Sequence, residues 1–139
     1  MLSSSCKYGI RAAAYLAHQE ADEDEYIPIR KISHDLKISF HFLTKVLQTL
    51  SQDGILVSYR GPNGGVALAR PAKEITVLDI IESIDGVSIF SSCILGLQEC
   101  SDRKPCALHT KWAKERQRLS DIFARTTLAQ LARVQGARV

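Results

Sequence analysis

Apolar side chains recur at helical spacing in five stretches of the chain, and these stretches predict five helices. Two shorter stretches, 55–59 and 66–69, alternate in a strand-like way and are joined by a run of turn-forming residues. The pattern therefore predicts a mainly α fold with one two-stranded β-hairpin. The predicted helices span residues 3–19, 28–36, 40–53, 77–85 and 106–134.

The helix predicted from residue 40 has an apolar face and a polar face. The apolar face consists of Leu43, Val46, Leu47 and Leu50. The polar face carries His41, Thr44, Lys45 and Gln48. Ser39 stands at the N-cap position, where its hydroxyl is expected to accept from a first-turn amide, and Gly54 is expected to end the helix in a left-handed conformation. Only residues 37–39 separate this helix from the preceding one, as in a helix-turn-helix unit.

The predicted hairpin follows the second helix of this unit directly. Its connection, residues 60–65, is rich in glycine and begins with Arg60. An ordinary surface hairpin is one interpretation. A DNA-contacting wing is the other, and Arg60 beside small residues suits insertion into a minor groove. The sequence thus favours a winged helix-turn-helix.

The last predicted helix, residues 106–134, is too long for a domain of this size to cover. At 1.5 Å per residue it would extend about 40 Å. Its apolar residues are Leu108, Trp112, Leu119, Ile122, Phe123 and Leu131. This excess predicts a partner helix, most simply the same helix of a second subunit, although a helix lying across its own domain is the alternative.

The composition is that of a single globular domain: 139 residues, 45% hydrophobic, with a net charge of +3. The acidic run 22–25 holds four of the fifteen acids, so the rest of the surface is more basic than the total implies. No apolar run is long enough to cross a membrane and no signal peptide is recognisable, so a cytoplasmic protein without a membrane partner is expected. No catalytic arrangement is evident, and an enzyme is not expected.

Three of the four cysteines, Cys93, Cys100 and Cys106, fall within fourteen residues, in and just after an aperiodic stretch, 87–105. Their wide, irregular spacing suits thiolates wrapped around an iron–sulfur cluster. Zinc bound by three Cys and one His is the main competing interpretation, with His109 one helical turn after Cys106. Arg103 and Lys104 would stabilise thiolates.

The chain resembles the IscR/NsrR/RirA family of regulators, also called Rrf-two-type winged-helix repressors. The resembling segments are residues 7–16, 38–50, 57–71, 75–86 and 106–112. The resemblance implies a homodimer, built on the C-terminal helix, that binds a palindromic operator in double-stranded DNA. It also implies a cluster on Cys93, Cys100 and Cys106 that senses nitric oxide, redox state or iron. One branch of the family uses an early acidic residue as fourth ligand. Lys7 stands there in this chain, which leaves His109, or Cys6, for that role.

These observations predict three regions: a winged helix-turn-helix in 1–86, a cysteine-bearing sensor loop in 87–106, and a dimerisation helix with a tail in 107–139. The expected function is transcriptional repression controlled by a two-iron or four-iron cluster. The alternatives are a cluster-free regulator that acts through thiol oxidation or a protein partner, and a metal or electron carrier whose helix-turn-helix is only structural. The expected DNA contacts are Ser39, His41, Phe42, Thr44, Lys45, Arg60, Gly61, Asn63 and Gly64. The expected ligands are Cys93, Cys100, Cys106 and His109.

Overall fold

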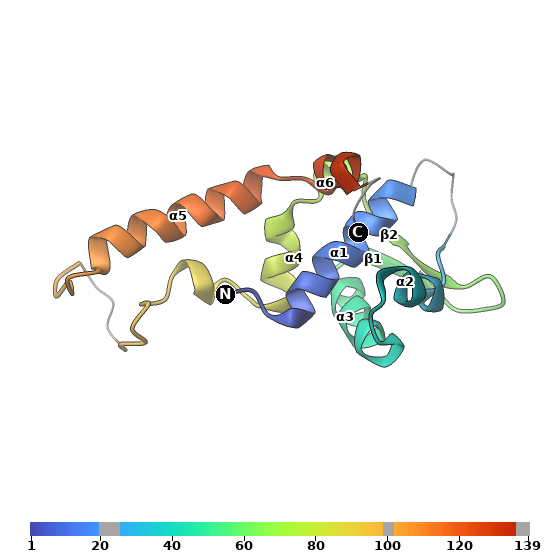
Figure 1. Cartoon of the computed structure of the whole chain (residues 1–139), viewed down its shortest axis with the longest axis horizontal. Coiled ribbons are helices and arrows are strands. Elements are labelled where there is room, and N and C mark those ends of the chain that lie inside the picture. The colour runs from blue at the N-terminus through green and yellow to red at the C-terminus, as the bar shows by residue number, and fades with distance from the viewer. Residues whose placement is uncertain (20–25, 99–101, 136–139) are drawn as a thin grey trace.

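The computed structural model describes residues 1–19, 26–98 and 102–135. It forms a helical body from which one long helix extends (Figure 1). The helices are α1 (Ser4–Gln19), α2 (Ile29–Leu36), α3 (Phe40–Gln52), α4 (Val77–Ile84), α5 (His109–Arg125) and α6 (Leu128–Gln135). The strands are β1 (Leu56–Tyr59) and β2 (Gly65–Leu68), and two short 3-10 turns are η1 (Ala72–Glu74) and η2 (Ser88–Phe90). No described helix has the length and apolar character needed to span a membrane.

The core of the body surrounds α1, which packs against α3, α4 and α6. In Figure 1, α1 runs through the middle of the body, between α6 and α3. The apolar stripes predicted for the first helices are buried here: Ile32 and Leu36 of α2 lie beside Leu43 and Leu47 of α3. Burying each such side chain contributes about 1.5–3 kcal/mol, so this packing fixes α2 and α3 relative to each other.

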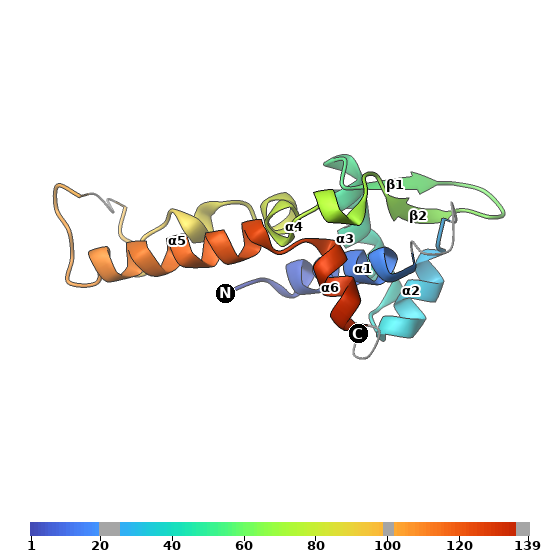
Figure 2. The same ribbon diagram turned by 90° about the horizontal axis from the view of Figure 1, so that it is seen from above.

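The remaining part of the chain, α5 with residues 87–98 and 102–108, projects from the body and is called the arm. Residues 87–98 run beside α5 in both views, and residues 102–108 lie at the far end (Figures 1 and 2). The rings of Phe90 and Phe123 have their centroids 6.1 Å apart at the base of the arm. The aperiodic stretch is thus folded back along the helix that follows it.

The predicted hairpin is present, with β1 and β2 antiparallel and Leu56 opposite Leu68. Residue Ile27, just before α2, forms a further bridge to Val66, with both backbone N–H···O distances at 2.9 Å. A Cβ at Gly65 would lie 2.2 Å from the Ile27 carbonyl oxygen. Glycine at this position therefore lets the chain before α2 approach the wing, which ties the wing to the helix-turn-helix.

The predicted ends of α3 are partly right. Gly54 has φ +75° and its amide donates to the Ser51 carbonyl, which confirms the left-handed stop. The predicted cap at Ser39 is wrong: within α3, which is described in full, no backbone amide donates to the Ser39 hydroxyl. The first helical bond instead joins the Leu43 amide to the Ser39 carbonyl at 2.9 Å. The exposed hydroxyl therefore remains available to another partner.

The single C-terminal helix predicted for 106–134 is also wrong, because it is two helices. Thr127 caps α6: its hydroxyl accepts from the Gln130 amide at 3.2 Å, and the Gln130 side chain accepts from the Thr127 amide at 2.8 Å. Leu128 is fully buried in the body and Leu131 packs against the same core. The chain therefore turns at residues 126–127. Leu131 packs against the protein's own core and does not continue the apolar side of α5 that was predicted to meet a partner helix.

Candidate functional site

The exposed face of α3 carries most of the residues predicted to touch DNA. Ser39, His41 and Lys45 are exposed, and Phe42 is 38% exposed with its ring against Tyr8 of α1, centroid to centroid 5.5 Å. Thr44 is half-buried, and its hydroxyl donates to the Phe40 carbonyl at 2.7 Å. The structure thus presents two hydrogen-bonding side chains and one cation near the start of α3. The Thr44 hydroxyl is already partly committed within the helix.

The tip of the wing presents the other predicted DNA contacts. Arg60, Gly61 and Asn63 are exposed, whereas Gly64 is half-buried. A Cβ at Gly64 would lie 2.5 Å from the Tyr59 carbonyl oxygen, so glycine is needed there for the tight connection. Gly64 therefore shapes the tip, while Arg60 and Asn63 supply the donors.

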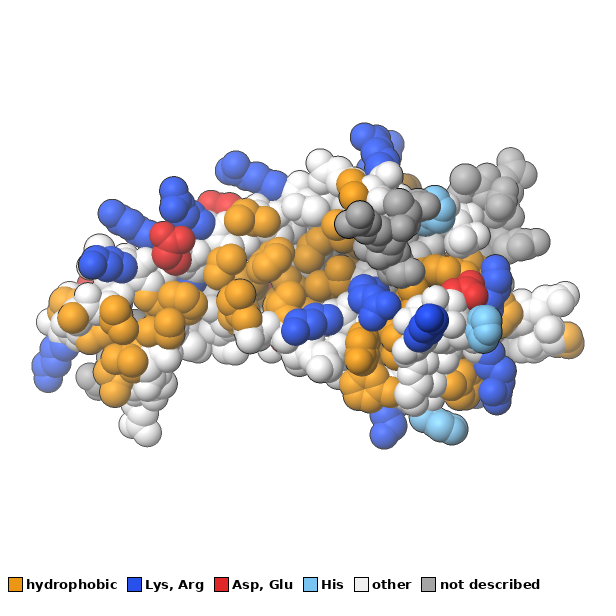
Figure 3. Space-filling model, in the orientation of Figure 1, with side chains coloured by type: hydrophobic (Ala, Val, Ile, Leu, Met, Phe, Trp, Pro, Cys, Tyr) orange, Lys and Arg blue, Asp and Glu red, His pale blue; other side chains and the backbone are white. Residues whose placement is uncertain are grey.

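Basic side chains gather on the same end of the body. Figure 3 shows Lys, Arg and His side chains over the region where Figure 1 places α2 and α3. Two residues of this surface were not predicted from the sequence. Arg30 has its guanidinium carbon 4.3 Å from the centroid of the Phe40 ring. Tyr8 contacts Phe42 from α1. The helical spacing of the basic residues in 30–37 could have pointed to Arg30.

The predicted ligands lie on the arm. Cys93 follows η2 and Cys106 precedes α5, and both are half-buried. Cys100 lies outside the described residues. The Ser92 carbonyl, one residue before Cys93, accepts from the Trp112 indole nitrogen at 3.0 Å and from Arg116 Nη1 at 3.3 Å. The backbone beside Cys93 is thereby held against α5.

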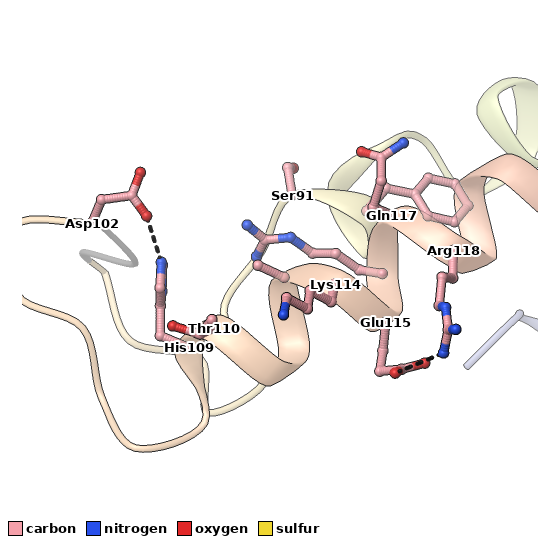
Figure 4. Close-up of a pocket in the computed structure, with 11 residues that line it drawn as sticks. Ser91, Asp102, His109, Thr110, Lys114, Glu115, Gln117 and Arg118 are labelled. Carbon is pink, nitrogen blue, oxygen red and sulfur yellow. Dashed lines mark hydrogen bonds and ion pairs between the residues drawn. The ribbon is translucent and has the colours of Figure 1, made fainter.

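His109 begins α5 and is 8% exposed. Its Nε2 lies 2.8 Å from Oδ1 of Asp102, and Figure 4 shows this pair at one end of an open groove of about 900 Å³. Ser91, Lys114 and Arg118 line the groove farther along α5. A carboxylate that holds an imidazole in this way fixes the orientation of the ring, as is common for metal-binding histidines.

The donor types suit a thiolate-bound cluster, since the loop carries three cysteines and a nearby histidine. The described side chains do not form a ready-made site. In residues 1–19, 26–98 and 102–135, no three His, Cys, Asp or Glu side chains come together as a metal-holding group. The predicted ligand set, for iron–sulfur or for zinc, therefore stays a prediction.

Cys6 is not suited to be the fourth ligand. It is completely buried in a small cluster with Val77 and Ile81 of α4. Burial, and secondarily the Asp85 carboxylate, raise the pKa of its thiol to about 12. Metal ligands are thiolates, and this thiol stays protonated at neutral pH.

The cluster around Cys6 also joins the arm to the body. Phe90 and Phe123 of the arm pack against it, together with Leu2 and Ile10 from the N-terminal segment. α1 in turn packs on α3. The base of the arm is therefore connected to α3 through α1.

The sequence profile of the Rrf2 family, described as iron-dependent transcriptional regulators, matches residues 2–134. A putative HTH-type transcriptional regulator of Aquifex aeolicus is 33% identical over 137 residues, which are 97% of this chain and 93% of that protein. The HTH-type transcriptional regulator IscR of Yersinia pseudotuberculosis is 30% identical over 134 residues, covering 96% and 80% of the two chains.

A solved structure is similar over the same length. The oxidized form of Staphylococcus aureus CymR superposes with a TM-score of 0.75 and 27% identity, covering 95% of each chain. The winged helix-turn-helix prediction is therefore confirmed, and the carrier protein with a merely structural helix-turn-helix is set aside. The match extends from the first helix through the wing to α6. This chain belongs to the Rrf2 family of DNA-binding transcriptional regulators.

Proposed function

We propose that the protein is a cytoplasmic repressor that binds a palindromic operator as a homodimer and is controlled through the cysteines of its arm. The observation that carries this proposal is the exposed polar face of α3, set beside a glycine-tipped wing. A helix of this kind fits a major groove about 12 Å wide, and its N-terminal residues can read base edges.

The DNA contacts divide between two elements. Ser39, His41, Phe42 and Lys45 of the α3 region would meet bases and phosphates in the major groove, with Thr44 restricted by its internal hydrogen bond. Arg60 and Asn63 would meet the minor groove and backbone, while Gly61 and Gly64 let the tip approach closely. Residues 1–86 form the DNA-binding region in this proposal.

Dimerisation is assigned to α5 within the region 107–139. Regulators of this family are usually dimeric. Ile122 on this helix is 57% exposed, and Leu108, the residue just before the helix, is 45% exposed. Figure 3 shows apolar side chains running along the arm and across its junction with the body. A symmetric pair of α5 helices would cover these side chains and set the spacing of the two recognition helices.

The sensor in this proposal is an iron–sulfur cluster held by Cys93, Cys100 and Cys106 of the loop 87–106, with His109 as fourth ligand. The family's description as iron-dependent supports it. When bound, the cluster supplies a centre that reacts with nitric oxide, oxygen or reductants. The Trp112–Ser92 bond and the Phe90–Phe123 contact connect the residues beside it to the base of the arm.

A cluster-free regulator that senses thiol oxidation is the second candidate. The similar CymR structure was obtained in an oxidized form, and Cys93 and Cys106 are both half-buried rather than enclosed. Both candidates share the same DNA-binding surface and differ only in the chemistry of the loop.

Equilibrium DNA binding tests the shared part. The probe is a duplex that the protein selects from randomised DNA, followed by fluorescence anisotropy over a range of salt concentrations. Lys45→Ala and Arg60→Ala should each weaken binding, and a variant that no longer neutralises one phosphate should show a salt slope smaller by about one per protomer. Failure to select any duplex, or unchanged affinity and slope in both variants, would contradict the proposed DNA surface.

A further inference from the structure

The exposed face of α2 carries a stripe of basic residues beside the recognition helix. Arg30, His34 and Lys37 are spaced by four and three residues, so they share one side of α2 and its C-terminal turn. The helix has one acidic residue, Asp35. Its carboxylate accepts a hydrogen bond from the Tyr15 hydroxyl at 2.6 Å and lies 3.3 Å from His34 Nδ1. Asp35 therefore does not neutralise the charges of Arg30 and Lys37.

Arg30 is held in a defined position by the first residue of α3. Its guanidinium lies over the Phe40 ring at 4.3 Å, and the His41 ring is 5.5 Å from that of Phe40. Among the described residues, no carboxylate lies within ion-pair distance of Arg30. A cation–π contact of this kind does not use up the N–H donors of the guanidinium, which can still bind a phosphate.

Lys37 is held in a conformation that costs free energy. Among the described residues it is the one non-glycine residue with positive φ, at 55°. Glycine would adopt this conformation without strain at the end of a helix. The side chain of Lys37 places an exposed cation in the turn between α2 and α3.

We propose that Arg30 and Lys37 bind backbone phosphates of the DNA that α3 reads, so that the DNA interface includes the exposed face of α2. The first helix of a helix-turn-helix crosses the DNA backbone while the second enters the groove. Arg30 and Lys37 lie on that first helix and on the turn that follows it. Phe40 is a positioning residue in this arrangement, because it orients Arg30. The proposal rests on the DNA binding proposed above.

The test measures salt-dependent binding to the selected duplex together with thermal unfolding. Arg30→Ala and Lys37→Gly should each lower the salt slope by about 0.9 per protomer. A homodimer carries each change twice, so its slope falls by about 1.8, and between 50 and 200 mM salt each variant should show a loss of affinity about twelvefold smaller than the wild type does. Arg30→Lys and Lys37→Arg keep the charge and should keep the slope. Lys37→Gly should unfold at the same temperature or higher, since the strain is removed.

Phe40→Leu separates positioning from charge. This change leaves Arg30 cationic, so the salt slope of DNA binding should be unchanged while the affinity for DNA falls about two- to fivefold. Lys73→Ala is the charge-matched control, because Lys73 is exposed on η1, which packs against α6.

Three outcomes identify which claim fails. If Lys45→Ala lowers the slope but Arg30→Ala and Lys37→Gly behave like Lys73→Ala, the α2 contacts are wrong and the DNA-binding function stands. If the wild-type protein selects no duplex, the proposed function fails and the α2 contacts fail with it. A stability change in Arg30→Ala without any change in slope would assign Arg30 a purely structural role and overturn the proposal.

Discussion

Trp112 donates a hydrogen bond from its indole nitrogen to the backbone carbonyl of Ser92, over 3.0 Å. Arg116, one turn later on α5, donates to the same oxygen at 3.3 Å. The residue before Cys93 is therefore held against the helix that follows Cys106. The chain is thus fixed to α5 just before Cys93, and Cys106 lies directly before α5, where its carbonyl accepts from the His109 amide at 3.1 Å.

Replacing Trp112 with Phe keeps a ring but removes the N–H donor. A hydrogen bond of this kind contributes about 0.5–1.5 kcal/mol, so local opening around residues 91–98 should become about two- to tenfold more frequent. Amide hydrogen exchange and the alkylation rate of Cys93 would both rise. Lys111→Ala, an exposed change on the same helix, is the control. Equal exchange rates in wild type and Trp112→Phe would show that the bond does not hold the loop.

Ile122 should lie in the interface between two subunits. It is 57% exposed in one protomer, so Asp at this position should leave the protomer folded. In a dimer the same charge would be buried without a partner, which is strongly unfavourable. Sedimentation velocity should show folded monomers for Ile122→Asp and dimers for Val134→Asp, a control on α6 with 76% exposure. A dimer formed by Ile122→Asp would place the interface elsewhere.

The cap at Thr127 should stabilise the protein measurably. Thr127→Ala removes the acceptor for the Gln130 amide, a loss of about 1 kcal/mol, or a few degrees in Tm. The control is Thr49→Ala, because the Thr49 hydroxyl donates to the Lys45 carbonyl inside α3 and does not stand at a helix start. If α5 and α6 were one continuous helix, Ala at 127 would favour the helix and raise Tm instead.

The Tyr15–Asp35 bond between α1 and α2 predicts a pH dependence of stability. Burial, and then the bond to Asp35, raise the pKa of Tyr15 to about 12, while the same bond is the main cause of a lowered pKa at Asp35. A raised tyrosine pKa contributes stability that is complete below about pH 10 and is lost as pH rises through the folded value. A lowered aspartate pKa contributes stability present above about pH 4 and lost as pH falls through the folded value.

Thermal unfolding of wild type and Tyr15→Phe across pH tests this pair. The Tm difference between them should be largest between about pH 4 and pH 10 and should shrink on either side. In an Asp35→Asn background the acid limb of this dependence should disappear. A Tm difference that stays constant across the whole range would mean that the bond is not formed.

The parts of the fold that the sequence predicted are those governed by local periodicity. Leu43, Leu47 and Leu50 reveal the buried side of α3, and the glycine-rich connection reveals the wing, because neither depends on distant contacts. The break at Thr127 was missed although its pattern, Thr-x-x-Gln, is an N-terminal capping signal. The apolar spacing continues through it, and only the packing of Leu128 against the body shows that the chain turns.

The candidate site was harder to predict from the sequence, because its contacts join residues that no local spacing relates. Ser39 was assigned to the cap because of its position, yet its hydroxyl makes no bond to α3. Arg30 and Phe40 are ten residues apart, on different helices, so no periodicity relates them. Spacing along an aperiodic loop likewise does not determine how near Cys93 and Cys106 come to each other.

Whether the arm holds an iron–sulfur cluster is tested by the visible absorption spectrum of anaerobically purified protein, with iron and sulfide analysis. The wild-type protein should be coloured and contain both elements. Colour should be lost in Cys93→Ser, Cys100→Ser and Cys106→Ser and kept in Cys6→Ser, since Cys6 is buried and protonated. Wild-type protein that lacks iron and sulfide in both anaerobic and aerobic preparations would contradict the claim and leave thiol oxidation, or zinc, as the chemistry of the loop.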